Sequence, residues 1–407
     1  MKKKVIHAVT IPDSLWFMEG QLKYLESSGY EVKAMSTEGK EAVKFSRSEG
    51  IEILKVDMER EISLFKDFKS LISCIRIFQK EKPLIVNAST PKAGLIVTLA
   101  AYICGVPIRI YTIRGLRAET TKGLKRQILL TAEKIAARSA THCLAVSESL
   151  KKRVVEFGIA NEEKILILGK GSGDGFHVER FQKTDDQDRK AKGQRCKYGL
   201  TNEHTVLGFT GRLTKDKGIN ELVAVFLKLH EKHKNLRLLI VGDYDTADAV
   251  EDKTQKEIEE NPNIIHTGFQ DDPVGFFHMM DIFVFLTKRE GFGNVSIEAA
   301  LTGIPVIASD VTGARDTIVD EKTGFLVDPL NLNDISEKLE LLILSPELCN
   351  KLGQNGRQWA IGNFSNDLIW KEMDRFYENC LAERLTSAGE NPQIESLVKK
   401  IGSRGNL

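Results

Sequence analysis

The amino-acid sequence predicts an α/β protein built from two doubly wound, Rossmann-like parallel sheets that face each other across a cleft. Short apolar runs rich in β-branched residues, which are typical of buried parallel strands, alternate with segments of helical length. Residues 182–193 are polar, charged and without periodicity, and they form the predicted linker. The alternation restarts after this stretch, which indicates a second sheet of the same class.

The first half supplies seven predicted strands, most of them followed by a helix. One helix carries apolar residues from Leu15 to Leu25 and ends at Gly29, and a long helix ends near Ala140. Further helices are expected at residues 41–49 and 66–80, after residue 94, and from residue 147. The predicted strands are residues 5–10, 30–35, 51–56, 84–88, 108–113, 142–146 and 164–167.

The second half repeats the pattern and ends in helices. Its predicted strands are residues 206–211, 236–242, 264–267, 281–287, 304–309 and 325–327. Its predicted helices are residues 219–233, 295–301, 330–344, 346–359 and 368–384. The domain prediction is therefore residues 1–185 and 195–365, with a polar tail at 386–407.

Composition excludes several classes of protein. A net charge of +1 gives no overall field that would favour nucleic acid. Six scattered cysteines without a C-x-x-C pair argue against a zinc site and a disulfide framework, and fit a reducing cytosol. The longest apolar stretch, residues 95–106, is too short to span a bilayer, and the N-terminus lacks a cleavage site. We therefore expect a cytoplasmic protein.

The run from Asp281 to Asp310 reads as strand, glycine turn, helix and strand, which is one βαβ unit. Free backbone N–H groups at the start of its helix can bind an anion, and Gly291 and Gly293 let a ligand approach the backbone. Glu290 and Glu298 bracket the turn with carboxylates that can accept from sugar hydroxyls. The alternative is an ordinary strand-to-helix turn with two solvated glutamates.

A basic loop follows the first strand of the second half, from Gly211 to Gly218. Arg212 and Lys217 lie at the carboxyl edge of the predicted sheet, where two cations can neutralise a diphosphate. A solvated basic loop is the alternative. The glutamate-bearing turn in the same sheet favours the ligand site.

The stretch from GRLTKDKGINELV to EGFGNVSIEAALTGIPVIASDVTGARDTIVDEKTGFLVDP resembles the donor half of glycosyltransferase family 4 enzymes. These are retaining, nucleotide-sugar-dependent enzymes with the GT-B fold. Glu290 and Glu298 match the family's E-x7-E motif, and Arg212, Lys217 and Gly313 match in order. The first half is a weaker match, mainly through STPKAG, Arg114-Gly115-Leu116 and AVSESL, and is similar to bacterial enzymes of capsular and lipid-linked polysaccharide synthesis.

The resemblance implies a role for each matched residue. Arg212 and Lys217 would hold the donor diphosphate, Glu290 would contact the transferred sugar, and Glu298 would bind the ribose. The backbone of the second-half pocket would come from Gly211, Gly291, Phe292, Gly293 and Asn294. The last helix, at about residues 366–385, would pack back onto the first domain.

The acceptor side is less defined. Many family members carry a histidine where this sequence has Arg114, and arginine cannot act as a base at neutral pH. Arg114 would bind phosphate or acceptor, and Thr90 and Lys92 would help to hold the pyrophosphate of a lipid-linked acceptor. Residues 169–175 are rich in glycine but do not match a P-loop, and a hinge or floor at the domain junction is favoured over a phosphate cradle.

Two further motifs have alternatives. Asp243-Tyr244-Asp245 spells D-x-D, a metal-binding motif in other glycosyltransferases, but at this place an ordinary loop is favoured and no metal is expected. The segment TKGLKRQILLTAEKIAAR is a basic amphipathic helix, which fits either an anionic membrane surface or an ordinary surface helix. Peripheral contact with the inner face of the plasma membrane is therefore part of the prediction.

The predicted activity is retaining sugar transfer from a nucleotide sugar, expected to be UDP-linked, to a polyprenyl-diphosphate-linked or polysaccharide-precursor acceptor. No cofactor, metal or nucleic acid is expected. One alternative is a nucleotide-sugar epimerase or phosphorylase of the same fold, although no pyridoxal-binding signature is present. The other is an inactive scaffold, against which the intact set of Arg212, Lys217, Glu290 and Glu298 argues.

Overall fold

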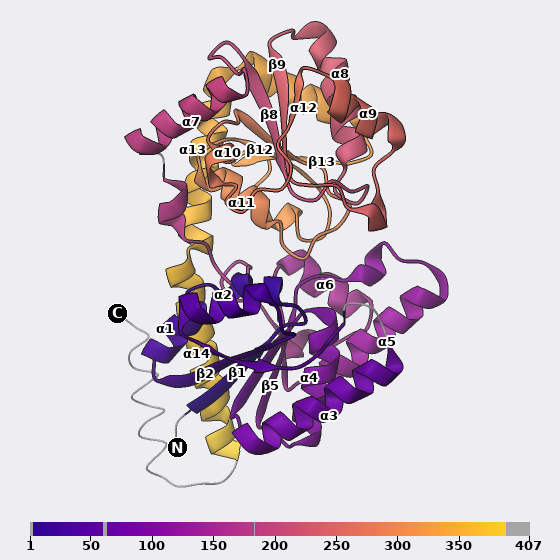
Figure 1. Cartoon of the computed structure of the whole chain (residues 1–407), viewed down its shortest axis with the longest axis vertical. Coiled ribbons are helices and arrows are strands. Elements are labelled where there is room, and N and C mark those ends of the chain that lie inside the picture. The colour runs from indigo at the N-terminus through magenta and orange to yellow at the C-terminus, as the bar shows by residue number, and fades with distance from the viewer. Residues whose placement is uncertain (1–2, 60–62, 183, 388–407) are drawn as a thin grey trace.

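The computed structural model describes residues 3–59, 63–182 and 184–387, and it contains two parallel sheets, one above the other in Figure 1. The first sheet has the strand order β3-β2-β1-β4-β5-β6-β7 and the second β10-β9-β8-β11-β12-β13, with every recorded strand pairing parallel. The central strands are buried on both faces because helices cover both sides. The two doubly wound sheets that the sequence predicts are confirmed.

The first sheet and its helices come from the first half of the chain. The strands are β1 (Lys3–Ala8), β2 (Tyr30–Ser36), β3 (Glu52–Lys55), β4 (Ile85–Ser89), β5 (Ile108–Ile113), β6 (His142–Ala145) and β7 (Ile165–Leu166). The helices are η1 (Pro12–Met18), α1 (Gln21–Ser27), α2 (Lys40–Glu49), α3 (Leu64–Glu81), α4 (Pro91–Ile103), η2 (Arg117–Glu119), α5 (Gly123–Ser139), α6 (Glu148–Glu156), η3 (Glu162–Lys164) and η4 (Val178–Phe181).

The second sheet and its helices follow in the same alternation. The strands are β8 (Thr205–Thr210), β9 (Leu236–Val241), β10 (Ile264–His266), β11 (Ile282–Phe285), β12 (Val306–Ser309) and β13 (Gly324–Val327). The helices are α7 (Asp185–Lys197), α8 (Ile219–Lys232), η5 (Thr246–Asp248), α9 (Asp252–Glu260), α10 (Val274–Phe277), α11 (Asn294–Leu301), η6 (Arg315–Thr317), α12 (Leu332–Leu344), α13 (Pro346–Phe364) and α14 (Asn366–Ser387).

The predicted linker is wrong over most of its length, because Asp185–Lys197 forms α7. The Thr184 side chain accepts a hydrogen bond from the Gln187 N–H and caps this helix. Arg195 fixes it to the second domain by donating to the carbonyl oxygens of Met279 and His204, at 2.8 and 2.9 Å. The segment reads as a linker because its apolar stripe is narrow, and tertiary contacts supply what periodicity does not show.

Other differences lie in short elements. The predicted helix from Leu15 to Leu25 is two elements, η1 and α1, broken at Gly20, which adopts a left-handed φ of 75° against the ring of Trp370. The sequence analysis did not predict α9 and α10. The predicted tail, 386–407, begins within the last turn of α14, and its residues 388–407 lie outside the described part of the chain.

The chain crosses between the domains twice, and the two crossings pair with each other. The Phe176 N–H donates to the Phe364 carbonyl, and the Asn366 N–H donates to the Phe176 carbonyl, each at 2.9 Å. Beyond this point α14 lies against α1 and along the first sheet (Figure 1). Its apolar residues Ile369, Met373 and Tyr377 are part of that domain's core.

The strand order places the loops that matter at two switch points. In the first sheet the order reverses between β1 and β4, and in the second between β8 and β11. Ligands of doubly wound sheets lie outside the carboxyl ends of the strands at such points. The loops after β4, β5, β8 and β11 therefore meet at the junction of the two domains.

Candidate active site

A pocket of about 410 Å³ lies at this junction, and its walls come from both halves of the chain. It contains seven of the residues that the sequence predicts as site residues: Thr90, Arg114, Lys217, Glu290, Gly291, Phe292 and Asn294. Phe17, Pro91, Gly115, Arg117, Val146, Gly173, Asp174, Phe285, Arg289 and Val295 complete the lining. Four cations and two carboxylates are among the lining residues, so the pocket has an excess of positive charge that suits an anionic ligand.

The pocket brings the basic loop and the glutamate-bearing turn into contact. The Lys217 ammonium forms an ion pair with the Glu290 carboxylate, and both side chains are largely buried. Lys217 also lies 5.5 Å from the centre of the Phe285 ring. Gly218 makes the approach possible, because a Cβ at this position would lie 2.1 Å from the Leu286 carbonyl oxygen. Next to this pair, Arg289 donates to Asp216 at 3.1 Å.

The turn before α11 owes its position to close backbone packing. A Cβ on Gly291 would lie 1.8 Å from the Arg114 carbonyl oxygen, which belongs to the other domain. Gly313 approaches Gly291 from the next loop and has a left-handed φ of 78°. Gly293 precedes Asn294, the first residue of α11, without a side-chain cap. The first backbone N–H groups of α11 are thus at the pocket, where a helix start favours negative charge.

Side-chain hydrogen bonds join the two domains around this turn. Ser147 donates to the Gly291 carbonyl oxygen at 2.8 Å and also caps α6. Ser149 donates to Asp316 and accepts from the Gly313 N–H, the latter at 2.7 Å. Thr312 donates to Glu119 at 2.7 Å. These contacts join the two domains beside the pocket, and Ser147 and Ser149 belong to the AVSESL segment that carried part of the resemblance.

On the first domain, Arg114 is paired within the protein. It makes a two-pronged ion pair with Asp174, at 2.5 and 2.6 Å, and its guanidinium lies 4.8 Å from the centre of the Phe17 ring. The Asp174 carbonyl accepts a hydrogen bond from the indole N–H of Trp370 at 2.7 Å. The glycine-rich segment 169–175 thereby ties β5, the domain junction and α14 together.

A buried polar network lies beneath Arg114 and includes a histidine. Burial lowers the pKa of His7 to about 3, with repulsion from Arg114 contributing, so the ring is neutral at physiological pH. Its Nε2 shares a hydrogen bond of 2.9 Å with the Tyr377 hydroxyl, which accepts from Asn87 at 3.0 Å. Thr112 donates to Asn87 at 2.7 Å. The network fixes α14 to β1, β4 and β5.

Thr90 and Lys92 separate in the structure. Thr90 lines the pocket and adopts an unusual left-handed φ of 76° at the start of α4, where its hydroxyl contacts that of Thr10 at 2.7 Å. Lys92 is buried and bonds to Asp67 of α3 at 2.6 Å, outside the pocket lining. Thr90 therefore lies in the pocket wall, and Lys92 connects α4 to α3.

Four predicted site residues of the second domain are not among the residues that line the pocket: Gly211, Arg212, Gly293 and Glu298. Arg212 is two-thirds exposed and forms an ion pair with Asp245. Gly211 ends β8 with a φ of 145°, and its carbonyl oxygen would lie 1.9 Å from a Cβ on Gly242. The ends of β8 and β9 thus present bare backbone.

Glu298 is on α11, one turn beyond the pocket wall. Burial raises the pKa of its carboxyl to about 7; nearby Arg180 opposes the shift and Asp272 adds to it. A glutamate of the first domain shows the same direction of shift. Burial raises the pKa of Glu133 to about 7 as well, against the effect of a 2.6 Å hydrogen bond from Tyr111.

Both aspartates of the D-x-D motif accept hydrogen bonds from nearby backbone N–H groups. Asp243 accepts from the Tyr244 N–H at 3.0 Å, while Asp245 caps η5 through the Ala247 N–H at 2.9 Å and pairs with Arg212. In the described part of the chain, no three His, Cys, Asp or Glu side chains gather as a metal site would require. The carboxylates of this motif are thus used as caps and as an arginine partner.

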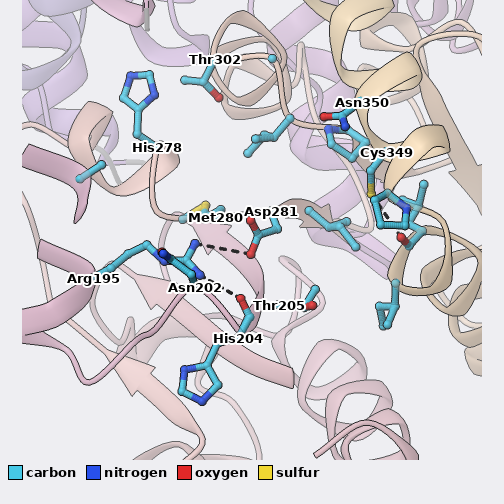
Figure 2. A pocket seen from close by; sticks show the side chains of 18 of the residues that line it. Arg195, Asn202, His204, Thr205, His278, Met280, Asp281, Thr302, Cys349 and Asn350 are labelled. Carbon is cyan, nitrogen blue, oxygen red and sulfur yellow. Dashed lines mark hydrogen bonds and ion pairs between the residues drawn. The ribbon is translucent and has the colours of Figure 1, made fainter. Parts of the chain in front are cut away.

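A larger pocket, of about 680 Å³, lies at the opposite edge of the second sheet (Figure 2). Its walls carry the amino ends of β8, β11 and β12 and parts of α7 and α13. Figure 2 shows Arg195 pointing to Asp281 and to the backbone beside His204, and these bonds hold α7 in place. The predicted site residues lie at the other edge, so this pocket belongs to the packing of α7.

Sequence reasoning missed several pocket residues. It assigned no site role to Phe17, Asp174 or Arg289, although all three line the pocket. Arg289 lies inside the glutamate-bearing turn and Asp174 inside the glycine-rich segment. The sequence therefore indicated the two loops, but it did not indicate that these two side chains line the pocket. Phe17 reads as an apolar residue of a helix. Its exposed fraction of 42% depends on tertiary packing, which the sequence pattern does not show.

The comparisons with known proteins all indicate glycosyltransferases. Residues 191–359 match the model for glycosyl transferases group 1, and residues 16–171 match a glycosyl transferase 4-like domain. The chain is 43% identical to the capsular polysaccharide biosynthesis glycosyltransferase CapM of Staphylococcus aureus, over 94% of this chain and 98% of that protein. It is 27% identical to the UDP-Gal:alpha-D-GlcNAc-diphosphoundecaprenol alpha-1,3-galactosyltransferase of Escherichia coli, over 78% and 80% of the two chains.

Solved structures give the same fold. Anabaena Alr3699/HepE in complex with UDP and glucose aligns with a TM-score of 0.77 at 18% identity, over 93% of this chain and all of that one. A glycosyltransferase from Rickettsia africae aligns with a TM-score of 0.75 at 22% identity, over 93% and 99%. The GT-B fold expected from the sequence is confirmed. In the described residues, no helix combines the length and apolar character of a membrane span.

Proposed function

This chain belongs to the group 1 glycosyl transferases, and from that premise we propose that it moves a sugar from a UDP-linked donor to a polyprenyl-diphosphate-linked glycan, with retention, in capsule synthesis. The observation that carries the proposal is the pocket between the two carboxyl edges, with its excess of cations and with Lys217 paired to Glu290 at the start of α11. The names of two relatives support this proposal. CapM supports the capsular role, and the diphosphoundecaprenol galactosyltransferase supports the acceptor class.

In this proposal the second domain holds the donor. The Lys217 ammonium and the first N–H groups of α11 face the diphosphate, and they stabilise the charge that grows on it as the bond between the sugar's anomeric carbon and the phosphate oxygen breaks. Arg212 is exposed enough to exchange Asp245 for a phosphate oxygen. Glu298 accepts from the ribose hydroxyls, and Glu290 from the sugar.

The first domain holds the acceptor opposite this leaving group. The acceptor hydroxyl approaches on the face from which the diphosphate departs, and it passes its proton to the departing phosphate oxygen. Thr90 and Arg117 offer polar contact to the acceptor, whereas Arg114 keeps Asp174 and orients that wall. Retention in this scheme needs no carboxylate nucleophile. Peripheral contact with an anionic membrane is part of the proposal, because the acceptor is anchored in one.

A transfer assay tests the proposal. The enzyme is incubated with each of several UDP sugars and a polyprenyl-diphosphate monosaccharide, and the lipid fraction is analysed by mass spectrometry. The proposal predicts one added sugar with the anomeric configuration of the donor, and at least about a hundredfold less product from Glu290→Gln. An epimerised nucleotide sugar formed without acceptor would contradict it, as would donor binding without any transfer.

A further inference from the structure

The first domain carries an exposed apolar surface next to the acceptor side of the pocket. Helices α3, α4 and α5 lie together on the face of the first sheet opposite to α14 (Figure 1). The middle helix, α4, is mostly buried, and its neighbours α3 and α5 flank it. Both flanking helices present large apolar side chains to solvent in the first turns, which lie at the carboxyl edge of the sheet.

The stripe on α5 lies opposite the face that packs. Leu124, Ile128 and Ile135 are 77%, 45% and 39% exposed, and their spacing places them within a narrow arc of the helix. The packing face carries Leu130, Glu133 and the alanines of the last turns. An ordinary surface helix presents polar residues where α5 presents this stripe, so the exposed face has a feature that folding does not explain.

Cations border the stripe. Lys125 lies on one side of it and Lys134 and Arg138 on the other, when the helix is drawn at 3.6 residues per turn. Lys122 precedes the helix, and no acidic residue occurs between Thr120 and Thr131. An apolar stripe between rows of lysine and arginine is the pattern of a helix that lies in the headgroup region of an anionic bilayer.

The first turn of α3 repeats the pattern beside α4. Leu64, Phe65 and Phe68 are 85%, 69% and 60% exposed, and the Lys69 ammonium lies 4.5 Å from the centre of the Phe65 ring. The Lys92–Asp67 bond joins this turn to the start of α4, whose first residues line the pocket. On the other side, Arg117 of the pocket wall precedes α5 by only a few residues.

We propose that the first turns of α3 and the outer stripe of α5 form one docking surface for an anionic lipid bilayer. Leu64, Phe65, Phe68, Leu124 and Ile128 enter the headgroup region, and Lys69, Lys122 and Lys125 contact its anionic phosphates. The surface deepens the proposed function, since a bilayer held there places a lipid-anchored acceptor at the first-domain side of the pocket.

Vesicle flotation tests the surface directly and needs no turnover. Phosphatidylcholine vesicles with and without phosphatidylglycerol are mixed with the full chain. The proposal predicts binding to the anionic vesicles that weakens as salt rises and is lost on phosphatidylcholine alone. A wild-type chain that floats with neither kind of vesicle, or equally with both, would overturn it.

Matched variants locate the surface. Leu124→Ser with Ile128→Ser removes exposed apolar area only, so the fold stays and anionic-vesicle binding weakens about tenfold or more. The control is Leu341→Ser with Leu344→Ser, a pair of 49% and 67% exposed leucines on α12 of the other domain, which should bind as the wild type does. Equal loss in both double variants, or in neither, would refute the assignment of this surface.

A second readout separates this proposal from the proposed function. Transfer is measured with the acceptor in anionic vesicles and with a short-chain, water-soluble analogue. The α5 variant should lose activity toward the vesicle acceptor and keep it toward the analogue. If the chain binds vesicles at this surface but transfers to neither acceptor, the docking surface is upheld and the proposed acceptor is contradicted. Equal activity of the α5 variant on both acceptors would overturn the docking surface.

Discussion

The carboxyl edge of the second sheet reaches the pocket through Lys217, Glu290 and bare glycine backbone, whereas the edge of the first reaches it through Arg114, which is already paired with Asp174. The second edge thus offers groups that a ligand can engage by exchanging one local ion pair. The first edge rests on buried bonds that run through His7, Asn87 and Tyr377 to α14. In the proposed function, the donor therefore meets groups that can exchange their partners, whereas the acceptor meets a wall that buried bonds hold in position.

The contact between the two edges gives the largest expected effect. Gly291→Ala places a methyl group where the Arg114 carbonyl oxygen lies 1.8 Å away, so the turn must move or the domains must part. We expect transfer to fall by about a hundredfold or more, because displacement of a catalytic turn by about 1 Å has such a cost. Steady-state rates measure it.

The matched control for this change is Gly362→Ala, a helical glycine whose added Cβ meets nothing within 4 Å. It should transfer at the wild-type rate and melt no lower. A Gly291→Ala enzyme that is as active as Gly362→Ala would show that the turn does not pack against the first domain.

The buried network of the first half should affect stability and leave donor binding alone. Tyr377→Phe leaves the His7 ring nitrogen and the Asn87 amide without their partner, so we expect the unfolding free energy to fall by about 1–3 kcal/mol. Denaturant unfolding measures it, with the exposed Tyr102→Phe as control. If Tyr377→Phe weakened nucleotide binding at unchanged stability, the network would act on the donor side, and the contrast between the two edges would be wrong.

The hydrogen bonds between the domains should have an intermediate effect. Ser149→Ala removes the hydroxyl's bond to the Asp316 carboxylate, which keeps its bond from the Ser149 N–H at 3.1 Å, and leaves the Gly313 N–H without its acceptor. We expect the contact between the domains to weaken and the KM for the donor to rise about tenfold, with less change in kcat. Ser27→Ala, an exposed serine of the same domain, is the control. An unchanged KM would show that these bonds between the domains do not affect donor binding.

The two glutamates with raised pKa, Glu133 and Glu298, give the smallest and most specific comparison. Folding raises the pKa of Glu133 and of Glu298 from 4.5 to about 7, so in this window the folded chain binds more protons than the unfolded chain. The unfolding free energy contributed by each group therefore falls as pH rises from about 4.5 to 7 and stays low above it. Either Glu→Gln change should flatten that part of the stability profile.

Nucleotide affinity separates the two glutamates. Only Glu298→Gln should weaken UDP binding, because Glu133 bonds to Tyr111 inside the first domain. Wild-type affinity should rise with pH as Glu298 ionises near pH 7 and becomes a better acceptor for ribose hydroxyls. Calorimetric titration across this range measures both. Equal affinity in wild type and Glu298→Gln would remove Glu298 from the donor site.

The sequence predicted the second half of the site more fully than the first, for a physical reason. Lys217, Glu290 and the glycines of the turn lie on loops that neighbouring parallel strands bring to one edge, so their proximity follows from strand order. The same motifs led to the prediction of Arg212 and Glu298 as site residues. Even so, the sequence did not show that Arg212 bonds to Asp245, which requires the side-chain geometry of two loops.

The first half depended on contacts between distant residues. His7 and Tyr377 come from opposite ends of the chain, and Asp174 meets Arg114 only because the crossing segment returns beneath β5. No local periodicity or residue spacing in the sequence predicts such long-range contacts. The same holds for α7, which forms on contacts of Arg195 with the second domain and whose sequence alone reads as a linker.

The central claim is that Lys217 and the turn before α11 together hold the diphosphate of a nucleotide sugar. The most direct test is the melting temperature of the wild type, Lys217→Ala and Lys288→Ala with and without UDP sugars, since a ligand that binds the folded state raises it. Lys288 is a matched control, because it pairs with Glu221 at 3.0 Å outside the pocket. The account predicts that a UDP sugar raises the melting temperature of the wild type and of Lys288→Ala and leaves that of Lys217→Ala unchanged. An equal rise in Lys217→Ala, or no rise in the wild type with any UDP sugar, would contradict it.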